Sequence, residues 1–275
     1  MGKVTGISWT DHTFNPWRGC TKVSAGCAHC YAERDSKRFG LDIWGNDKKR
    51  LIASESMWKQ PVKWNEEAIE AGERRRVFCA SFADVFEELP ELLVARARLW
   101  QLIRDTPSLD WLVLTKRAEN LFHMTPVAWK MEDKFPENLW IGVSVENQQA
   151  ADERIPYLLR IPAAVRFLSV EPMIGPVDLR NVDDDGMGYQ DALKGLTFCA
   201  GKDEPALGHK IDWVICGGES GAGNRPMDPA WARDLRDQCK ETGTAFFCKQ
   251  MGGERDKKEG FYDLPEDLRI RIFPR

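Results

Sequence analysis

The pattern of apolar residues becomes regular after about residue 75. Short apolar runs without polar alternation predict strands buried on both faces, and we expect them at 76–81, 111–115, 139–145, 165–170, 213–216 and 245–248. Stretches between several of these runs predict helices at about 90–104, 148–159 and 229–242, the first with leucines along one side. Strands that alternate with helices in this way are typical of a parallel sheet with helices packed outside it.

A further strand is expected near residues 13–17, which brings the sheet to six or seven strands. This pattern predicts an α/β fold, with a partial or complete (β/α) barrel of mostly parallel strands. A doubly wound open sheet is the alternative, because periodicity alone does not separate the two. A length of 275 residues fits one barrel, so we expect a single domain over residues 1–275.

Three parts of the chain depart from this rhythm. A helix is expected after Cys30, at about 32–39, within an irregular excursion over 32–75. Residues 178–210 are interpreted as an insertion, either a functional lid or a mobile loop. The charged residues 255–275 are interpreted as a C-terminal appendage.

Nearly every predicted strand ends in charged or polar side chains. Because the carboxyl ends of parallel strands meet at one mouth of a barrel, we expect these side chains to surround one site. The alternative is that strands ending in water simply end in polar residues. The side chains concerned are Ser81, Asp84, Lys116, Arg117, Ser144, Glu146, Glu171, Glu219, Lys249 and Gln250.

The composition indicates a soluble protein with a large core, since 43% of residues are hydrophobic and 30% are charged. No apolar run is long enough to span a bilayer, and the first residues have no signal-peptide core, so no membrane partner is expected. The eight cysteines then favour metal binding or packing over a disulfide framework, and a cytoplasmic location.

Charge is distributed unevenly along the chain. The net charge is −4, but residues 1–80 carry 14 Lys+Arg against 10 Asp+Glu. Basic runs occur at 48–50 and 74–76, and several of the 11 tryptophans, Trp17 among them, lie in the same third. The runs are either solvated loop charges or a phosphate-facing patch, and tryptophans among basic residues can also stack on unpaired bases.

Three cysteines stand close together near the start of the chain. Cys20 and Cys27 are separated by six residues, and Cys27 and Cys30 by two. Two thiolates in C-x2-C spacing can bind one metal centre from a single turn, and a third can reach it from the flanking loop. Three ligands without a nearby fourth cysteine indicate a centre with one open position, as a catalytic metal requires.

Two simpler interpretations of these cysteines are possible. One is a zinc site with His29 or His12 as the fourth ligand, although a single C-x2-C pair lacks the second ligand pair of most structural zinc sites. The other is ordinary buried cysteine, which we expect for Cys79, Cys199, Cys216, Cys239 and Cys248.

The segment Asn-Pro-Trp17-Arg18-Gly-Cys20, followed by Cys27-Ala-His29-Cys30-Tyr-Ala, resembles the cluster loop of radical S-adenosylmethionine (SAM) enzymes. In that superfamily three cysteines bind a [4Fe-4S] cluster whose fourth iron binds SAM, usually with C-x3-C-x2-C spacing and an aromatic residue before the last cysteine. This chain has six residues in the first gap and His29 in the aromatic position. It resembles the spore photoproduct lyase branch and, more narrowly, a phage- and prophage-associated family with the same three-cysteine motif.

The resemblance implies roles for side chains at the ends of the early strands. Ser81 and Asp84 match the segment that meets the SAM amino group, and Ser144 and Glu146 match polar residues that meet its ribose or carboxylate. Two more strand-end residues suit the chemistry of SAM. The ammonium of Lys116 can pair with the carboxylate of SAM, and the carboxylate of Glu171 can accept from its hydrogen-bond donors.

Later strands are expected to face the substrate. The glycine-rich loop 217–225 can hold an anion with its amides and Arg225, with Glu219 beside them, although a capped turn explains it equally well. Lys249 is expected to bind or protonate substrate and Glu219 to act beside it as a catalytic residue, or else the two simply pair with each other. The remaining candidates are Gln250, Trp17 and Arg18 for substrate binding, and Cys216 and Cys248 as hydrogen donors like the additional cysteine of photoproduct lyases.

The leading hypothesis is therefore a radical SAM enzyme that cleaves SAM reductively to a 5′-deoxyadenosyl radical. The branch resemblance suggests a nucleic-acid base as substrate, in DNA repair or phage DNA modification, with an external electron donor and room for a protein partner. The alternative is a zinc-stabilised module that binds nucleic acid or protein without catalysis. A third hypothesis is an iron–sulfur protein that acts only as a redox sensor or scaffold.

Overall fold

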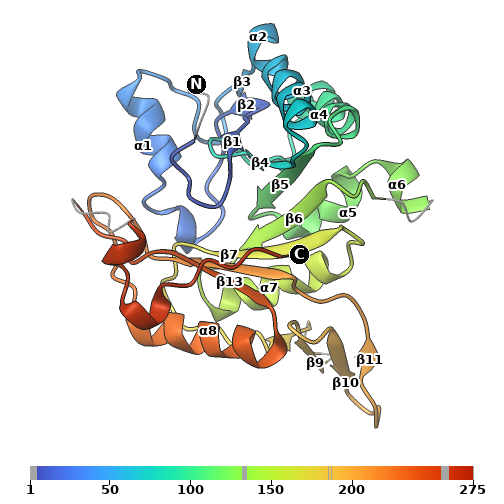
Figure 1. Cartoon of the computed structure of the whole chain (residues 1–275), viewed down its shortest axis with the longest axis vertical. Coiled ribbons are helices and arrows are strands. Elements are labelled where there is room, and N and C mark those ends of the chain that lie inside the picture. Colours follow the sequence, from blue (N-terminus) through green and yellow to red (C-terminus); the bar gives the residue numbers. More distant parts are fainter. Residues whose placement is uncertain (1–4, 132–134, 185, 187, 255–259, 275) are drawn as a thin grey trace.

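The computed structural model describes residues 5–131, 135–184, 186, 188–254 and 260–274. Within these residues the main sheet has seven strands, all parallel, in the order β1-β4-β5-β6-β7-β12-β13. This order follows the chain without reversal, whereas a doubly wound sheet reverses at a switch point. The sheet curls into a half-barrel, so the prediction of a partial (β/α) barrel is confirmed (Figure 1).

The strands and helices have the following bounds. The strands are β1 His12–Thr13, β2 Trp17–Arg18, β3 Leu51–Ile52, β4 Arg75–Cys79, β5 Leu109–Thr115, β6 Leu139–Ser144, β7 Val165–Val170, β8 Val182–Asp183, β9 Gly188–Asp191, β10 Leu196–Cys199, β11 Ala206–Leu207, β12 Trp213–Gly217 and β13 Ala245–Gln250. The α-helices are α1 Tyr31–Arg38, α2 Glu55–Trp58, α3 Gln60–Ala71, α4 Leu93–Asp105, α5 Leu121–Met124, α6 Val127–Met131, α7 Gln148–Leu159 and α8 Pro229–Thr242.

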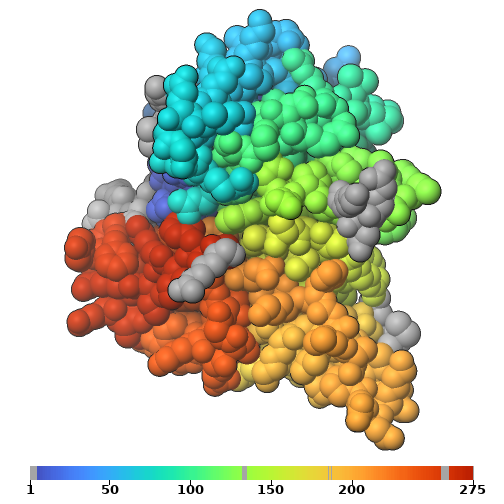
Figure 2. All heavy atoms as spheres, turned by 45° about the vertical axis from the view of Figure 1, so that its right-hand side comes forward, coloured from blue at the N-terminus to red at the C-terminus, as the bar shows by residue number. Residues whose placement is uncertain are grey.

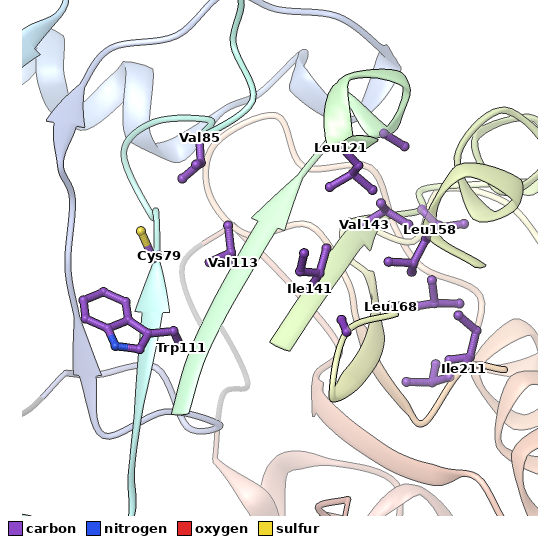
Figure 3. Close-up of a cluster of buried hydrophobic side chains, with 14 of the residues drawn as sticks. Cys79, Val85, Trp111, Val113, Leu121, Ile141, Val143, Leu158, Leu168 and Ile211 are labelled. Atoms are coloured by element: carbon purple, nitrogen blue, oxygen red, sulfur yellow. The ribbon is translucent and has the colours of Figure 1, made fainter. Parts of the chain in front are cut away.

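The outer core lies between the convex face of the sheet and the helices that cover it. Figure 3 shows Val113 of β5, Ile141 and Val143 of β6, and Leu121 and Leu158 of the helices within one cluster of buried side chains. All five side chains are fully buried. Each strand packs against apolar side chains on both of its faces. This packing explains why the sequences of the strands are uniformly apolar.

The inner core fills the lower part of the half-barrel, on its concave side. It consists mainly of aromatic rings, and Trp9 bridges it, with ring centroids 4.7 Å from Phe78 and 6.3 Å from Trp213. Phe273 packs from below, 5.4 Å from both Trp213 and Phe247. The concave side therefore has an apolar floor, and space remains at the carboxyl ends of the strands.

The expected strand at 13–17 is two short pieces in the structure. β1 joins the main sheet beside β4, while β2 pairs antiparallel with β3 in a separate ribbon. Pro16, which lacks an amide hydrogen, lies between the two pieces. The helix expected at 32–39 is confirmed as α1.

The insertion over 178–210 is neither a plain lid nor a plain loop. Its described residues form an antiparallel sheet in the order β11-β10-β9-β8, with residues 185 and 187 outside the description. This sheet projects at the lower right of the molecule, away from α1 (Figures 1 and 2). Of the C-terminal appendage, residues 260–274 are described and include two 3₁₀ turns, while 255–259 and 275 are not.

Candidate functional site

A cavity of about 500 Å³ lies over the carboxyl ends of the parallel strands. The first of its walls is the segment 20–30, here called the cysteine loop, and the others come from the strand ends. All three cysteines of the motif line it. It is also lined by the strand-end residues Ser81, Asp84, Lys116, Arg117, Ser144, Ser169, Glu171, Glu219, Lys249 and Gln250.

Local backbone geometry brings the three thiols of the cysteine loop to one wall. Gly19 precedes Cys20 with φ at 104°, and a Cβ there would lie 2.3 Å from the Ile43 carbonyl oxygen, so glycine is required. A 3₁₀ turn over Ala25–Cys27 follows, and Cys30 is the N-cap of α1. The thiols of Cys20, Cys27 and Cys30 are free and partly exposed.

The chemistry of these thiols suits a cationic centre. Burial, with Asp84 as the next contributor, raises the pKa of the Cys20 thiol to about 12, and burial also raises the pKa of Cys30. A buried thiolate is therefore costly here unless positive charge compensates it.

The arrangement also differs from that of a single bound ion. Within the described ranges, no three side chains of His, Cys, Asp or Glu converge as one metal ion requires. In a [4Fe-4S] cluster each cysteine binds a different iron, so its ligands stand further apart than the ligands of one ion. Three free cysteines on one loop line the same cavity, which is the donor set that such a cluster would take.

Buried arginine–carboxylate pairs hold the cysteine loop at its Cys20 end. Arg117 bonds Asp84 at 3.1 Å and donates to the Thr21 carbonyl at 2.9 Å. Glu87 accepts the Thr21 amide at 2.9 Å and pairs with Arg50 at 2.8 Å. These contacts fix the position of Cys20 from two sides.

Two more pairs hold the middle of the loop. Glu146 accepts the Gly26 amide at 3.2 Å and pairs with Arg154 at 2.7 Å. Arg225 donates to the Ala25 carbonyl at 3.0 Å and chelates Glu219. The loop is thus tied to the ends of β6 and β12, far from it in sequence.

Glu219 also bonds the histidine of the motif. Its Oε2 lies 3.0 Å from His29 Nδ1. Burial alone would raise the pKa of Glu219, but hydrogen bonds from Arg225 and His29 outweigh it and hold the pKa at about 2. Glu219 is therefore an ionised carboxylate that orients His29 at the cavity wall.

Several expected cofactor or substrate ligands are instead part of this scaffold. Glu146 does not line the cavity, because Arg154 and Gly26 hold its carboxylate elsewhere. Asp84 does line it, but its oxygens accept hydrogen bonds from Thr115, Lys116 and Arg117. Arg225 was expected to bind an anion, and its guanidinium is taken up by Glu219 and Ala25.

Fewer polar side chains than the sequence predicts therefore remain to face the cavity. Lys116 lines it, and across the described residues no carboxylate lies within 4.0 Å of its ammonium. Lys249 pairs with Glu171 at 2.7 Å, so the expected pairing with Glu219 is wrong. Gln250 donates to the same Glu171 oxygen at 2.8 Å. Ser81 and Ser144 also line the cavity, at the strand ends where they are expected.

The two cysteines expected as hydrogen donors do not reach the cavity. Cys216 and Cys248 are fully buried in the outer core. Their strand neighbours Ile215 and Phe247 belong to the inner core, and successive side chains of a strand point to opposite faces. Cys216 Sγ instead lies 3.8 Å from Met173 Sδ.

The expected aromatic and basic contributions also lie elsewhere. Trp17 is fully buried, and Arg18 stands 5.7 Å from the Phe82 ring, outside the cavity lining. The run 74–76 lies at the amino end of β4, opposite the cavity, where it pairs with Asp110, Glu67, Glu73 and Asp11. The prediction of a phosphate-facing patch is therefore wrong for residues 74–76. Their side chains are solvated charges that pair with carboxylates.

Sequence reasoning missed several residues of the site. Trp9 and Trp44 line the cavity, and Arg50, placed in a basic run, is buried against Glu87. Arg154 on α7 lies eight positions after Glu146, which precedes the helix, and this short separation offers the only sequence signal for their pair. The Arg50–Glu87 pair has no such signal, because 37 positions separate its members.

Comparison with known proteins gives one match. No curated protein and no solved structure matches the chain. No helix in the described parts of the chain is long and apolar enough to cross a membrane. A family model covers residues 4–264, nearly the whole length of the fold and every residue of the site. The chain therefore belongs to the family described as "Protein of unknown function (DUF5131)".

Proposed function

We propose that this protein is a radical SAM enzyme. The observation that carries the proposal is the position of three partly exposed thiols, on one loop, at a cavity over the carboxyl ends of a parallel half-barrel. Active sites of β/α barrels are built at this end. Cys20, Cys27 and Cys30 would hold a [4Fe-4S] cluster and leave one iron free for SAM.

When bound at these cysteines, such a cluster would supply the one electron that splits SAM into methionine and a 5′-deoxyadenosyl radical, the species that would abstract hydrogen from a substrate. The chain contributes binding, orientation and exclusion of water. The free ammonium of Lys116 suits the SAM carboxylate, and the hydroxyls of Ser81 and Ser144 suit its amino group and ribose. The inner core below them keeps water from entering through the floor.

The substrate would occupy the side of the cavity formed by β7 and β13. Glu171, Lys249 and Gln250 form one hydrogen-bonded group there, with no net charge. A nucleic-acid base as substrate loses two of its supports, because Trp17 is buried and the run 74–76 lies at the opposite end of β4. The proposal therefore concerns the reaction class, together with an external one-electron donor.

The test is anaerobic reconstitution with iron and sulfide, followed by incubation with dithionite and SAM. We expect a brown protein that binds about four irons and releases 5′-deoxyadenosine. Cys27→Ser should lose both properties. Cys199→Ser is the matched control, because Cys199 is also partly exposed but lies on β10, outside the cavity lining.

Two results would contradict the proposal. A colourless protein that binds one zinc ion and ignores SAM would support the zinc-stabilised binding module. A protein that holds the cluster but never cleaves SAM would support a redox sensor or scaffold.

A further inference from the structure

We infer that Arg117 sets the reduction potential of the cluster, by donating a charged hydrogen bond to the sulfur of Cys20. The inference rests on the proposed function, because it requires a cluster at the three cysteines. It assigns to Arg117 a positioning and tuning role, separate from binding SAM or substrate.

The geometry of Arg117 leaves its guanidinium little freedom. Its Nη1 lies 3.4 Å from Cys20 Sγ and 3.1 Å from Asp84 Oδ2. Its Nη2 donates to the Thr21 carbonyl at 2.9 Å and lies 3.4 Å from Glu87. The side chain is 9% exposed, so solvent competes little for these contacts.

The three sulfurs have different surroundings. Asp84 and Glu87 bring two negative charges near Cys20, and Arg117 and Arg50 bring two positive ones. Among the described contacts of the three thiols, the bond from Arg117 is the one that comes from a charged side chain. The thiol of Cys27, by comparison, lies 4.0 Å from a serine hydroxyl.

The consequence follows from charge. Reduction adds one negative charge to the cluster and its thiolates, and a fixed cation beside one sulfur stabilises that state more than the oxidised one. Hydrogen bonds to the sulfurs are among the features that set the potential of an iron–sulfur cluster. Arg117 should therefore raise the midpoint potential and make the cluster easier to reduce.

The experiment is a redox titration of the reconstituted protein, followed by the electron paramagnetic resonance signal of the reduced cluster. For Arg117→Met we expect the ratio of reduced to oxidised cluster at the wild-type midpoint to fall about tenfold, which is about 59 mV for one electron. The double variant Arg117→Met/Asp84→Asn removes one charge of each sign and with it the risk of an unpaired buried carboxylate. It should shift in the same direction by a smaller amount.

The matched control is Arg154→Met/Glu146→Gln. It removes a buried pair that holds the same loop without a hydrogen bond to any of the three sulfurs. Its midpoint should stay at the wild-type value. An equal fall in this control would show that a loosened loop lowers the potential, and would overturn the role of Arg117.

Other outcomes are equally decisive. Unchanged midpoints in both Arg117 variants, at full iron content, overturn the inference and leave the proposed function intact. Loss of the cluster in both would mean that Arg117 builds the site and does not tune it, which also overturns the inference. A wild-type protein that assembles no cluster overturns the proposed function itself.

Discussion

Arg154→Met should destabilise the protein strongly. Arg154 and Glu146 are almost fully buried, and Nη1 lies 2.7 Å from both Glu146 Oε2 and the Ser144 carbonyl oxygen. Removing one partner of a buried pair leaves an uncompensated charge, which costs about 3–5 kcal/mol. Since single domains are stable by about 5–15 kcal/mol, the variant should lose a large part of its free energy of unfolding.

The loss in free energy of unfolding caused by Arg154→Met should also depend on pH. In the wild type, burial tends to raise the pKa of Glu146, but the hydrogen bond and charge of Arg154 outweigh it and lower the pKa. The ionised group then contributes stability that is present above its unfolded pKa and is lost as the pH falls. In the variant, burial without a partner raises the pKa, so protonation relieves the penalty on acidification. The difference between the two proteins should therefore shrink as the pH falls.

The assay is urea unfolding of both proteins without iron, under reducing conditions, at about pH 7.5 and about pH 5.5. The reasoning would be refuted by a loss below about 1 kcal/mol, or by the same loss at both pH values. Arg233→Met is the control, because its pair with Asp267 is more than 40% exposed on both sides. Solvent screens an exposed pair, so this variant should unfold close to the wild type.

Three further predictions concern the cavity and its floor. Lys116→Met should keep the iron content and weaken SAM binding about 10- to 100-fold in equilibrium dialysis, since a charged hydrogen bond contributes about 1.5–3 kcal/mol. Unchanged SAM binding would show that Lys116 is not part of the SAM site. Gly142→Ala should cost about 1–3 kcal/mol in urea unfolding, because its Cβ would lie 2.5 Å from the Phe167 ring. Cys216→Ala should release 5′-deoxyadenosine at the wild-type rate, because the thiol is fully buried in the outer core; a loss of product at wild-type stability would contradict this placement.

The regular part of the fold could be predicted because buried parallel strands need uniformly apolar sequence. β5, β6, β7, β12 and β13 all lie within one or two residues of their expected positions. The same uniformity hides which way each side chain points. With apolar residues on both faces, the sequence of β12 contains no alternation that would place Cys216 in the outer core and Ile215 in the inner core.

The candidate site was predictable in place but not in the roles of its residues. Parallel topology puts every strand-end residue at one edge, so the sequence could gather Lys116 and Glu146 near the cysteines. It could not show that Glu146 faces Arg154 while Lys116 faces the cavity, because that depends on which partner reaches each group in three dimensions. Long-range pairs such as Arg50 with Glu87 carry no periodic signal at all.

The bridge that Trp9 makes across the half-barrel has a consequence for how the chain folds. Its ring touches Phe78 on one side and Trp213 on the other, a partner more than 200 positions further along the chain. Contacts of such separation form late, because the loop they close must lose its freedom first. During synthesis, at about 5–20 residues per second, the floor beneath the cysteine loop therefore stays open until β12 has emerged. The cavity in front of the three thiols is thus finished only on a nearly complete chain, and in the proposed enzyme the cluster would be assembled as the last step of folding.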